Sequence, residues 1–250
     1  MATERSALEQ TPELTAHAVK TRRERLFFGG MTIAMLVTVI AGFGPTYYFS
    51  SVSSSTAVLT PALHVHGAVF TTWMLLLVVQ TTLISAGRVD LHRKLGVAGG
   101  VLGACMMALA AYVAITRFRG GFLTLGPDFP AGMLLAIALA TVVVFPVLFG
   151  SALVLRRRTD FHKRLVLLAT MELVIAAIAR LPVINTLGPP AFFGVTDLFV
   201  VALVVYDFSA RGRIHPATLW GGLFFIASQP LRLAIGFSAP WASFAGWLMS

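Results

Sequence analysis

Two stretches of this chain, Arg88-Val89-Asp90-Leu91-His92-Arg93-Lys94-Leu95 and Arg158-Thr159-Asp160-Phe161-His162-Lys163-Arg164-Leu165, are near copies of each other. Each copy stands at the mouth of an apolar run of about 20 residues, the length that a helix needs to cross the hydrocarbon layer of a bilayer. The repeat therefore predicts two membrane helices that start at the same face of the membrane. It also places His92 and His162 equivalently at that face.

The composition is typical of an integral membrane protein with several spans. Of the 250 residues, 57% are hydrophobic and only 12% are charged, and the mean hydropathy of +0.85 lies outside the usual range of soluble domains. Apolar runs of spanning length occur at residues 26–48, 62–86, 95–116, 130–155, 164–184, 191–208 and 216–237. The sequence thus predicts an all-α polytopic bundle of seven transmembrane helices, with residues 26–250 as a single domain.

The first 25 residues are polar and basic, and their composition gives them little to bury. The apolar run that follows is too long for a signal peptide and has no small-residue cleavage site. We therefore expect residues 1–25 to form a disordered basic cytoplasmic tail before an uncleaved first span.

The distribution of positive charge predicts the orientation. The tail and the connectors after the second, fourth and sixth runs carry 15 of the 19 Lys and Arg residues. The positive-inside rule then places the N-terminus in the cytoplasm and the C-terminus outside. We expect a multi-pass protein of the bacterial inner (plasma) membrane.

The formal charge of +9 points to a lipid partner rather than to nucleic acid. The cations stand at the ends of the predicted spans, where anionic lipid headgroups of the cytoplasmic face attract them. A lone Cys105 inside a predicted span excludes an internal disulfide.

Polar residues inside the predicted spans are the candidates for function, because ionisable groups in hydrocarbon are costly and usually face the bundle interior. A polar route through the bundle would be lined by Gln80, Glu172, Arg180, Asp197 and Arg232. Arg180 or Arg232 could instead form an ion pair with Asp197.

Helical phase separates several of these candidates. His64 and His66 point about 200° apart on a regular helix, so both cannot bind one metal ion unless that turn is irregular. They are either interfacial hydrogen-bonding residues or, for at least one of them, a metal or proton site.

The residues after His92 form a small-residue stripe, Gly96, Gly99, Gly100, Gly103 and Ala104. This stripe predicts either tight helix packing or room for a planar cofactor.

Four segments carry a resemblance to known proteins: 64–80 (His64-Val65-His66-Gly67 to Gln80), 87–96 (Gly87-Arg88 to Gly96), 160–165 and 212–222. They resemble a widespread group of uncharacterised bacterial seven-span membrane proteins, and the likeness covers nearly the whole chain. It implies the seven-span fold and no particular activity.

The chain is also similar, more weakly, to the transmembrane ascorbate- and ferric-reducing cytochromes b. That resemblance implies a haem b held by His92 and His162, with Arg93 and Arg164, or Arg88 and Lys163, neutralising its propionates. A quinol or a metal ion would then bind His64 or His66 at the outer face. The chain departs from the family at the second haem, because the fourth run has no histidine to partner His64 or His66.

Three functions follow from the same residues: a haem-binding membrane electron carrier or reductase with a quinone or membrane-protein partner, a transporter of a small solute or metal ion, and a non-catalytic membrane subunit or assembly factor. Each of the three lysines lies in the tail or at the mouth of a run, which excludes a retinal Schiff base in a span. The chain has neither a phosphate-binding loop motif nor a His-Glu-x-x-His zinc motif.

Overall fold

The computed structural model describes residues 2–53, 59–123, 125 and 128–250, and side chains from Arg22 onward. The protein is all-helical, with 84% of its residues in helices and no strand in the described part. Its elements are α1 (Ala2–Phe43), the π-helical turn η1 (Gly44–Tyr48), α2 (Pro61–Ser85), α3 (Val89–Arg119), α4 (Met133–Val154), α5 (Thr159–Ile178), α6 (Pro182–Leu187), α7 (Pro189–Arg211), α8 (Pro216–Gly236) and α9 (Ala239–Met249).

The helix ends follow local signals in the sequence. At the start of α2, the Thr60 side chain accepts a hydrogen bond from the Leu63 amide, and proline occupies the first helical position. His215 and Ser238 cap α8 and α9 in the same way. Gly212 ends α7 with a φ of 67°, a left-handed conformation that glycine adopts without strain.

Five segments of the described residues are long and apolar enough to cross a membrane: Arg22–Tyr48, Pro61–Ser85, Val89–Arg119, Met133–Val154 and Pro189–Arg211. Helices α8 and α9 meet this criterion together but are bent by 69°, so they add at most one more span. The predicted run 164–184 is not among them. It is split between α5 and the short α6, and α5 carries four charged residues that lower its hydropathy.

The two repeated segments lie inside helices rather than ahead of them. Helix α3 begins at Val89 and α5 at Thr159, six and five residues before the apolar runs predicted from the sequence, because the acidic residue at the second position of each helix is well placed at a helix N-terminus. His92 and His162 therefore both occupy the fourth helical position.

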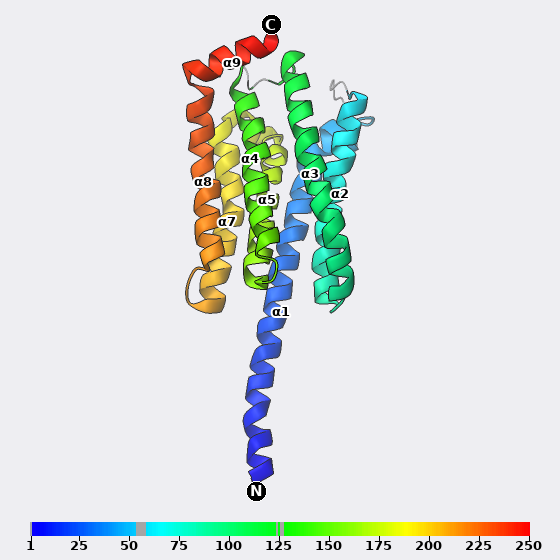
Figure 1. Cartoon of the computed structure of the whole chain (residues 1–250), viewed down its shortest axis with the longest axis vertical. Helices are drawn as coiled ribbons and strands as arrows, with labels where there is room; N and C mark the ends of the chain where they lie inside the picture. The colour runs from blue at the N-terminus through cyan, green and yellow to red at the C-terminus, as the bar shows by residue number, and fades with distance from the viewer. Residues whose placement is uncertain (1, 54–58, 124, 126–127) are drawn as a thin grey trace.

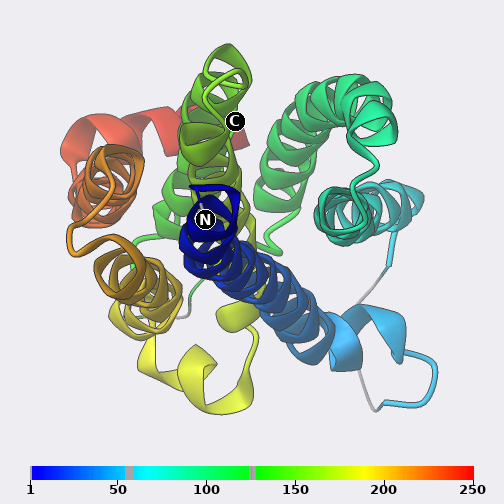
Figure 2. The ribbon, with the colours of Figure 1, turned by 90° about the horizontal axis from the view of Figure 1, so that it is seen from below.

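Helix α5 is the centre of the bundle and contacts α1, α4, α7 and α8. Most of its side chains are buried. Helices α2 and α3 pack against each other on one side, with α1 and α4 as their neighbours, whereas α7 and α8 pack on the other side. Figure 2 shows these two groups separated by α1 and α4, and α9 lies across the end of the bundle that is remote from the N-terminus (Figure 1).

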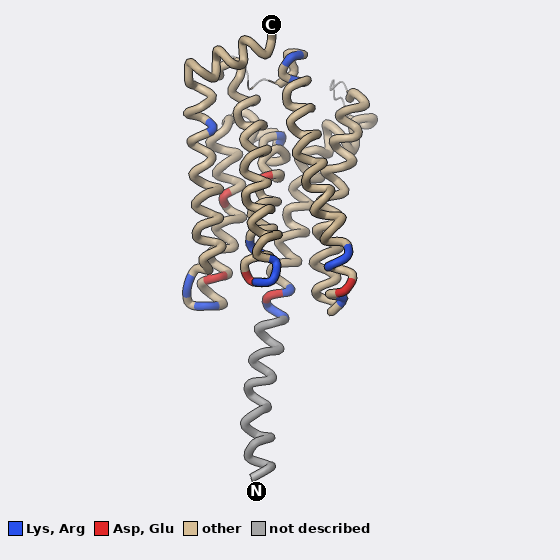
Figure 3. The backbone as a smooth tube through the Cα atoms, viewed as in Figure 1, with Lys and Arg blue, Asp and Glu red and all other residues tan. Residues whose placement is uncertain are grey.

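Charged residues gather at the end of the bundle nearer the N-terminus, as Figure 3 shows. We call this the basic end and define it by the connectors 86–88, 155–158 and 212–215 together with residues 22–25. Few charges lie between the basic end and the opposite end. The helical backbone of α1 continues into the predicted tail, residues 1–25. Because side chains are described only from Arg22 onward, the disordered tail stays a prediction.

Candidate functional site

The histidines of the repeat meet at the basic end of the bundle. The rings of His92 on α3 and His162 on α5 lie with their centroids 6.3 Å apart and their planes at 84°. Both side chains are half-buried. The structure therefore brings together two imidazoles that the sequence places on separate helices.

Hydrogen bonding orients one of these rings. Nδ1 of His162 lies 2.9 Å from the carbonyl oxygen of Ala152 on α4. In the tautomer that carries its hydrogen on Nδ1, the ring donates to this carbonyl, and Nε2 keeps a free lone pair. An imidazole held in this way is a typical metal ligand, because the carbonyl orients the ring and raises its basicity.

Two polar atoms beside the histidine pair lack partners. Nδ1 of His92 and Oε1 of Gln80 are buried without a hydrogen bond to any described residue. Gln80 lies over Gly96, one turn after His92, where a Cβ on the glycine would be 3.7 Å from Nε2 of Gln80. Because buried polar atoms are nearly always hydrogen-bonded, these two atoms indicate a water or ligand between α2, α3 and α5.

The two imidazoles offer two nitrogen donors close together between α3 and α5. Among the described residues, no group of three His, Cys, Asp or Glu side chains is arranged to hold a metal ion. The donor set therefore suits a metal that takes only two ligands from the protein, as haem iron does in b-type cytochromes.

The glycine stripe of α3 is used for helix packing. A Cβ on Gly99 would lie 3.2 Å from Leu76 of α2, and one on Gly103 would lie 3.0 Å from Phe149 of α4. Trp73 also fills this space and donates from Nε1 to Oγ1 of Thr170, at 3.3 Å. A planar cofactor along Gly99 and Gly103 would meet these side chains, so this part of the stripe serves helix packing.

Of the three arginines predicted to neutralise a haem propionate, Arg88 is paired with Asp90 at 3.5 Å, whereas Arg93 has no ion pair among the described residues. Its side chain is exposed on α3. Arg164 is buried and forms an ion pair with Asp207 of α7, with Nε 2.9 Å from Oδ1. Asp207 also accepts hydrogen bonds from Oγ1 of Thr218 and from the amide of His215. Arg164 thus joins α5 to α7 and α8.

Charges that are mostly half-buried extend this network to α1. Asp160 forms ion pairs with Lys163 at 2.6 Å and with Arg211 of α7 at 3.1 Å. Lys163 also contacts Glu24 of α1 at 2.5 Å. The sequence alone does not predict the pairing of Asp207 with Arg164, because a contact between α5 and α7 has no local signature.

A second buried ion pair lies in the interior of the bundle. Arg232 of α8 makes two parallel hydrogen bonds to the carboxylate of Glu172 on α5, both 2.7 Å long. Oγ1 of Thr141 donates to the same carboxylate at 2.7 Å, and the Arg232 guanidinium donates to Oγ of Ser228 at 2.8 Å. The alternative pairing of Arg232 with Asp197 is wrong.

The remaining residues of the predicted polar route lie apart from this pair. Asp197 accepts a hydrogen bond from Nε2 of Gln229, at 2.7 Å. Arg180 is exposed, with its guanidinium 4.4 Å from the centre of the Phe43 ring and no ion pair among the described residues. The predicted polar route is therefore not continuous in the structure. Glu172 and Arg232 pair with each other, and Asp197 is hydrogen-bonded to Gln229. Arg180 lies apart from both, and Gln80 lies beside the histidine pair.

His64 and His66 lie at the first turns of α2, away from the basic end. The His66 ring stacks on Phe70 at 4.2 Å, and its buried Nδ1 has no partner among the described residues. His64 is exposed, and its carbonyl accepts a hydrogen bond from the Tyr47 hydroxyl at 3.1 Å. The two rings have different neighbours, and no shared metal site is formed from described residues.

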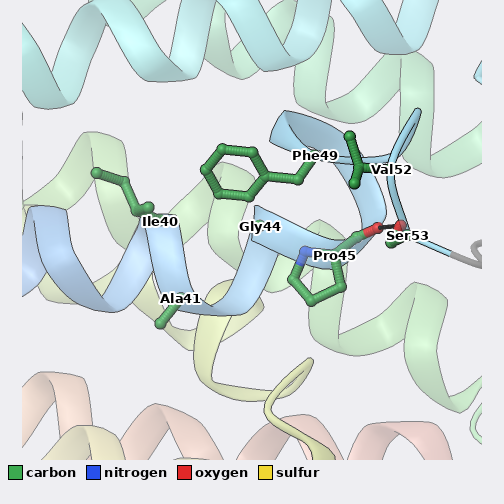
Figure 4. A pocket seen from close by; sticks show the side chains of 7 residues that line it. All are labelled: Ile40, Ala41, Gly44, Pro45, Phe49, Val52 and Ser53. Carbon is green, nitrogen blue, oxygen red and sulfur yellow. Dashed lines mark hydrogen bonds between the residues drawn. The ribbon is translucent and has the colours of Figure 1, made fainter.

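A cavity of about 420 Å³ opens near this end of α1. Figure 4 shows its lining, with the Phe49 ring facing back toward Ile40. The lining residues are Ile40, Ala41, Gly44, Pro45, Phe49, Val52 and Ser53. None of these lining residues is titratable.

Comparison with protein-family models, with curated proteins and with solved structures finds no match. The resemblances drawn from the sequence therefore stay predictions.

Proposed function

We propose that this protein is a membrane electron carrier that holds a b-type haem between His92 and His162 at the basic end. The observation that carries the proposal is the closeness of these two rings, whose centroids lie 6.3 Å apart between α3 and α5. The haem would supply one-electron redox chemistry, and the protein would supply the ligands and their orientation.

The surrounding residues have separable roles in this proposal. The Ala152 carbonyl orients the His162 ring through Nδ1. Exposed Arg93 stands one residue after His92 and can neutralise a propionate, whereas Arg164 is committed to Asp207 and positions α5. Gln80, with its unpaired Oε1, lies on α2 beside Gly96, one turn after His92. The redox partner in this proposal is a quinone or another membrane protein.

Electron paramagnetic resonance of the oxidised, purified protein tests the coordination. Two imidazoles whose planes are nearly perpendicular leave the iron d-orbitals nearly degenerate, so we expect a strongly anisotropic low-spin ferric signal. The 84° angle between the rings is the basis of this expectation. A high-spin ferric signal would contradict ligation by both histidines.

Transport is less well supported by the same residues. The Glu172 carboxylate and the two terminal nitrogens of Arg232 are bound to each other in a buried, bidentate pair, and Arg180 is separate from both. A solute path requires polar groups that are available to the solute along the membrane. These ion pairs instead hold α5 to α7 and α8, as a non-catalytic subunit would also require.

We further propose that the chain crosses the membrane seven times, with the basic end in the cytoplasm. The seven helices would be α1 to α5, α7 and α8, with the charged residues of α5 paired inside the bundle. Exposed Arg156, Arg157 and Arg213 at the basic end would contact anionic lipid headgroups.

Reporter fusions after Ser250 and within the connector 155–158 test this orientation. Alkaline phosphatase is active only outside the cytoplasm, so we expect activity from the fusion after Ser250 and none from a fusion at Arg157. The opposite pattern would reverse the proposed orientation, and activity from neither or both would contradict the odd number of spans.

A further inference from the structure

Asp197 lies deep inside a membrane-spanning helix. It is the ninth residue of α7, which is long and apolar enough to cross a membrane. At a rise of 1.5 Å per residue, its Cα is about 12 Å from the start of the helix, well within a hydrocarbon layer roughly 30 Å thick. Its side chain is half-buried at the edge of an exposed stripe that includes Leu198 and Val201.

The carboxyl group of Asp197 has a neutral partner only. Nε2 of Gln229 donates to Oδ1 at 2.7 Å. No Lys, Arg or His nitrogen of the described residues forms an ion pair with it, and Arg232, one turn after Gln229 on α8, is bound through both terminal nitrogens to Glu172 of α5. The contacting helix α6 offers Asn185, which carries no charge.

The contrast with Glu172 predicts different protonation states for the two carboxyl groups. An ionised carboxylate in an apolar medium is stabilised only by a cation or by several hydrogen bonds, and without them it takes up a proton. Glu172 has an arginine and a threonine hydroxyl as donors. Asp197 has one amide donor and lies half-buried beside the exposed stripe of α7.

We propose that Asp197 carries a proton at neutral pH and is a proton-binding site inside the membrane, reachable from the lipid side. Gln229 donates to the carbonyl oxygen of the neutral acid, and the hydroxyl is the exposed group. This inference does not depend on haem binding.

Infrared spectroscopy of the protein in liposomes at pH 7 tests the proposal. We expect a carbonyl stretch of a protonated carboxylic acid in the wild-type protein that disappears in Asp197→Asn. Asp90→Asn is the matched control, because Asp90 is exposed at the basic end, and it should leave the band unchanged. In Gln229→Leu the band should move to higher frequency, since the carbonyl loses its hydrogen bond.

Reaction with dicyclohexylcarbodiimide gives an independent readout on the wild-type protein alone. The carboxyl O–H adds across one C=N bond of the reagent, with its proton passing to nitrogen, so the adduct retains every atom of both reactants. Peptide mapping should find the adduct at Asp197 and none at Asp90. An intact Asp197→Asn protein that keeps the infrared band, or a wild-type protein that is unlabelled at Asp197, would overturn the proposal.

Discussion

Replacing Arg232 by alanine is expected to abolish recovery of folded protein from detergent extracts. The substitution leaves the Glu172 carboxylate buried, with its side chain 0% exposed and without a cation. Removing one partner of a buried ion pair typically costs about 3–5 kcal/mol, which is a large part of the roughly 5–15 kcal/mol by which proteins are usually stable. Size-exclusion chromatography and thermal unfolding in detergent measure the loss.

Two further variants distinguish the effect of breaking the ion pair from the effect of losing any arginine. Arg180→Ala removes an arginine that is exposed and has no ion pair among the described residues, so we expect a wild-type elution profile. The double variant Glu172→Leu with Arg232→Leu removes both charges and should be more stable than Arg232→Ala. An Arg232→Ala protein as stable as the wild type would show that Glu172 does not depend on this arginine.

Replacing His92 or His162 by alanine is expected to remove bound haem almost completely, by more than tenfold. Each ring is one of only two ligands that the described residues offer at this site, so neither can be replaced by a neighbour. Haem content per protein, measured from the absorption of the pyridine complex, gives the loss directly.

The matched control for this prediction is His64→Ala. His64 is exposed on α2 at the other end of the bundle, and we expect its loss to leave haem content unchanged. Adding imidazole to the His162→Ala protein should restore part of the haem, because the small ligand can occupy the vacated space. If both alanine variants keep full haem content while folded, the iron is held elsewhere.

Hydropathy was sufficient to locate most of the helices. The predicted runs 62–86 and 216–237 agree with α2 and α8 to within one residue, because an apolar run bounded by polar or helix-ending residues has few alternatives. The run 164–184 was placed less well. Its apolar residues extend past Ile178, but Pro182 starts a new helix. The charged residues of α5 also pair with residues on other helices, and a hydropathy profile contains no information on such pairing.

The repeat predicted the equivalence of His92 and His162, and the structure confirms that both occupy the same helical position. Their mutual distance could not be predicted, since it depends on how α3 and α5 are arranged around α4. The same holds for Arg164. Its position close to His162 in the sequence suggested a role in cofactor binding, but its ion-pair partner is Asp207, which lies far along the chain.

The prediction that the polar residues of the spans face the bundle interior is correct for some of them only. Glu172 and Arg232 are buried, whereas Arg180 is exposed and Asp197 is half-buried. Helical phase relates residues on one helix, and it contains no information on which face of α8 meets which face of α5. For this reason the Glu172–Arg232 pair was found only in the structure.

The reduced-minus-oxidised absorption spectrum of the purified wild-type protein, with iron determined on the same sample, tests the central proposal most directly. We predict sharp b-type bands and close to one iron per chain, held by His92 and His162. A colourless, iron-free protein purified from haem-replete cells would contradict it, and the two histidines would then have a structural role at the basic end.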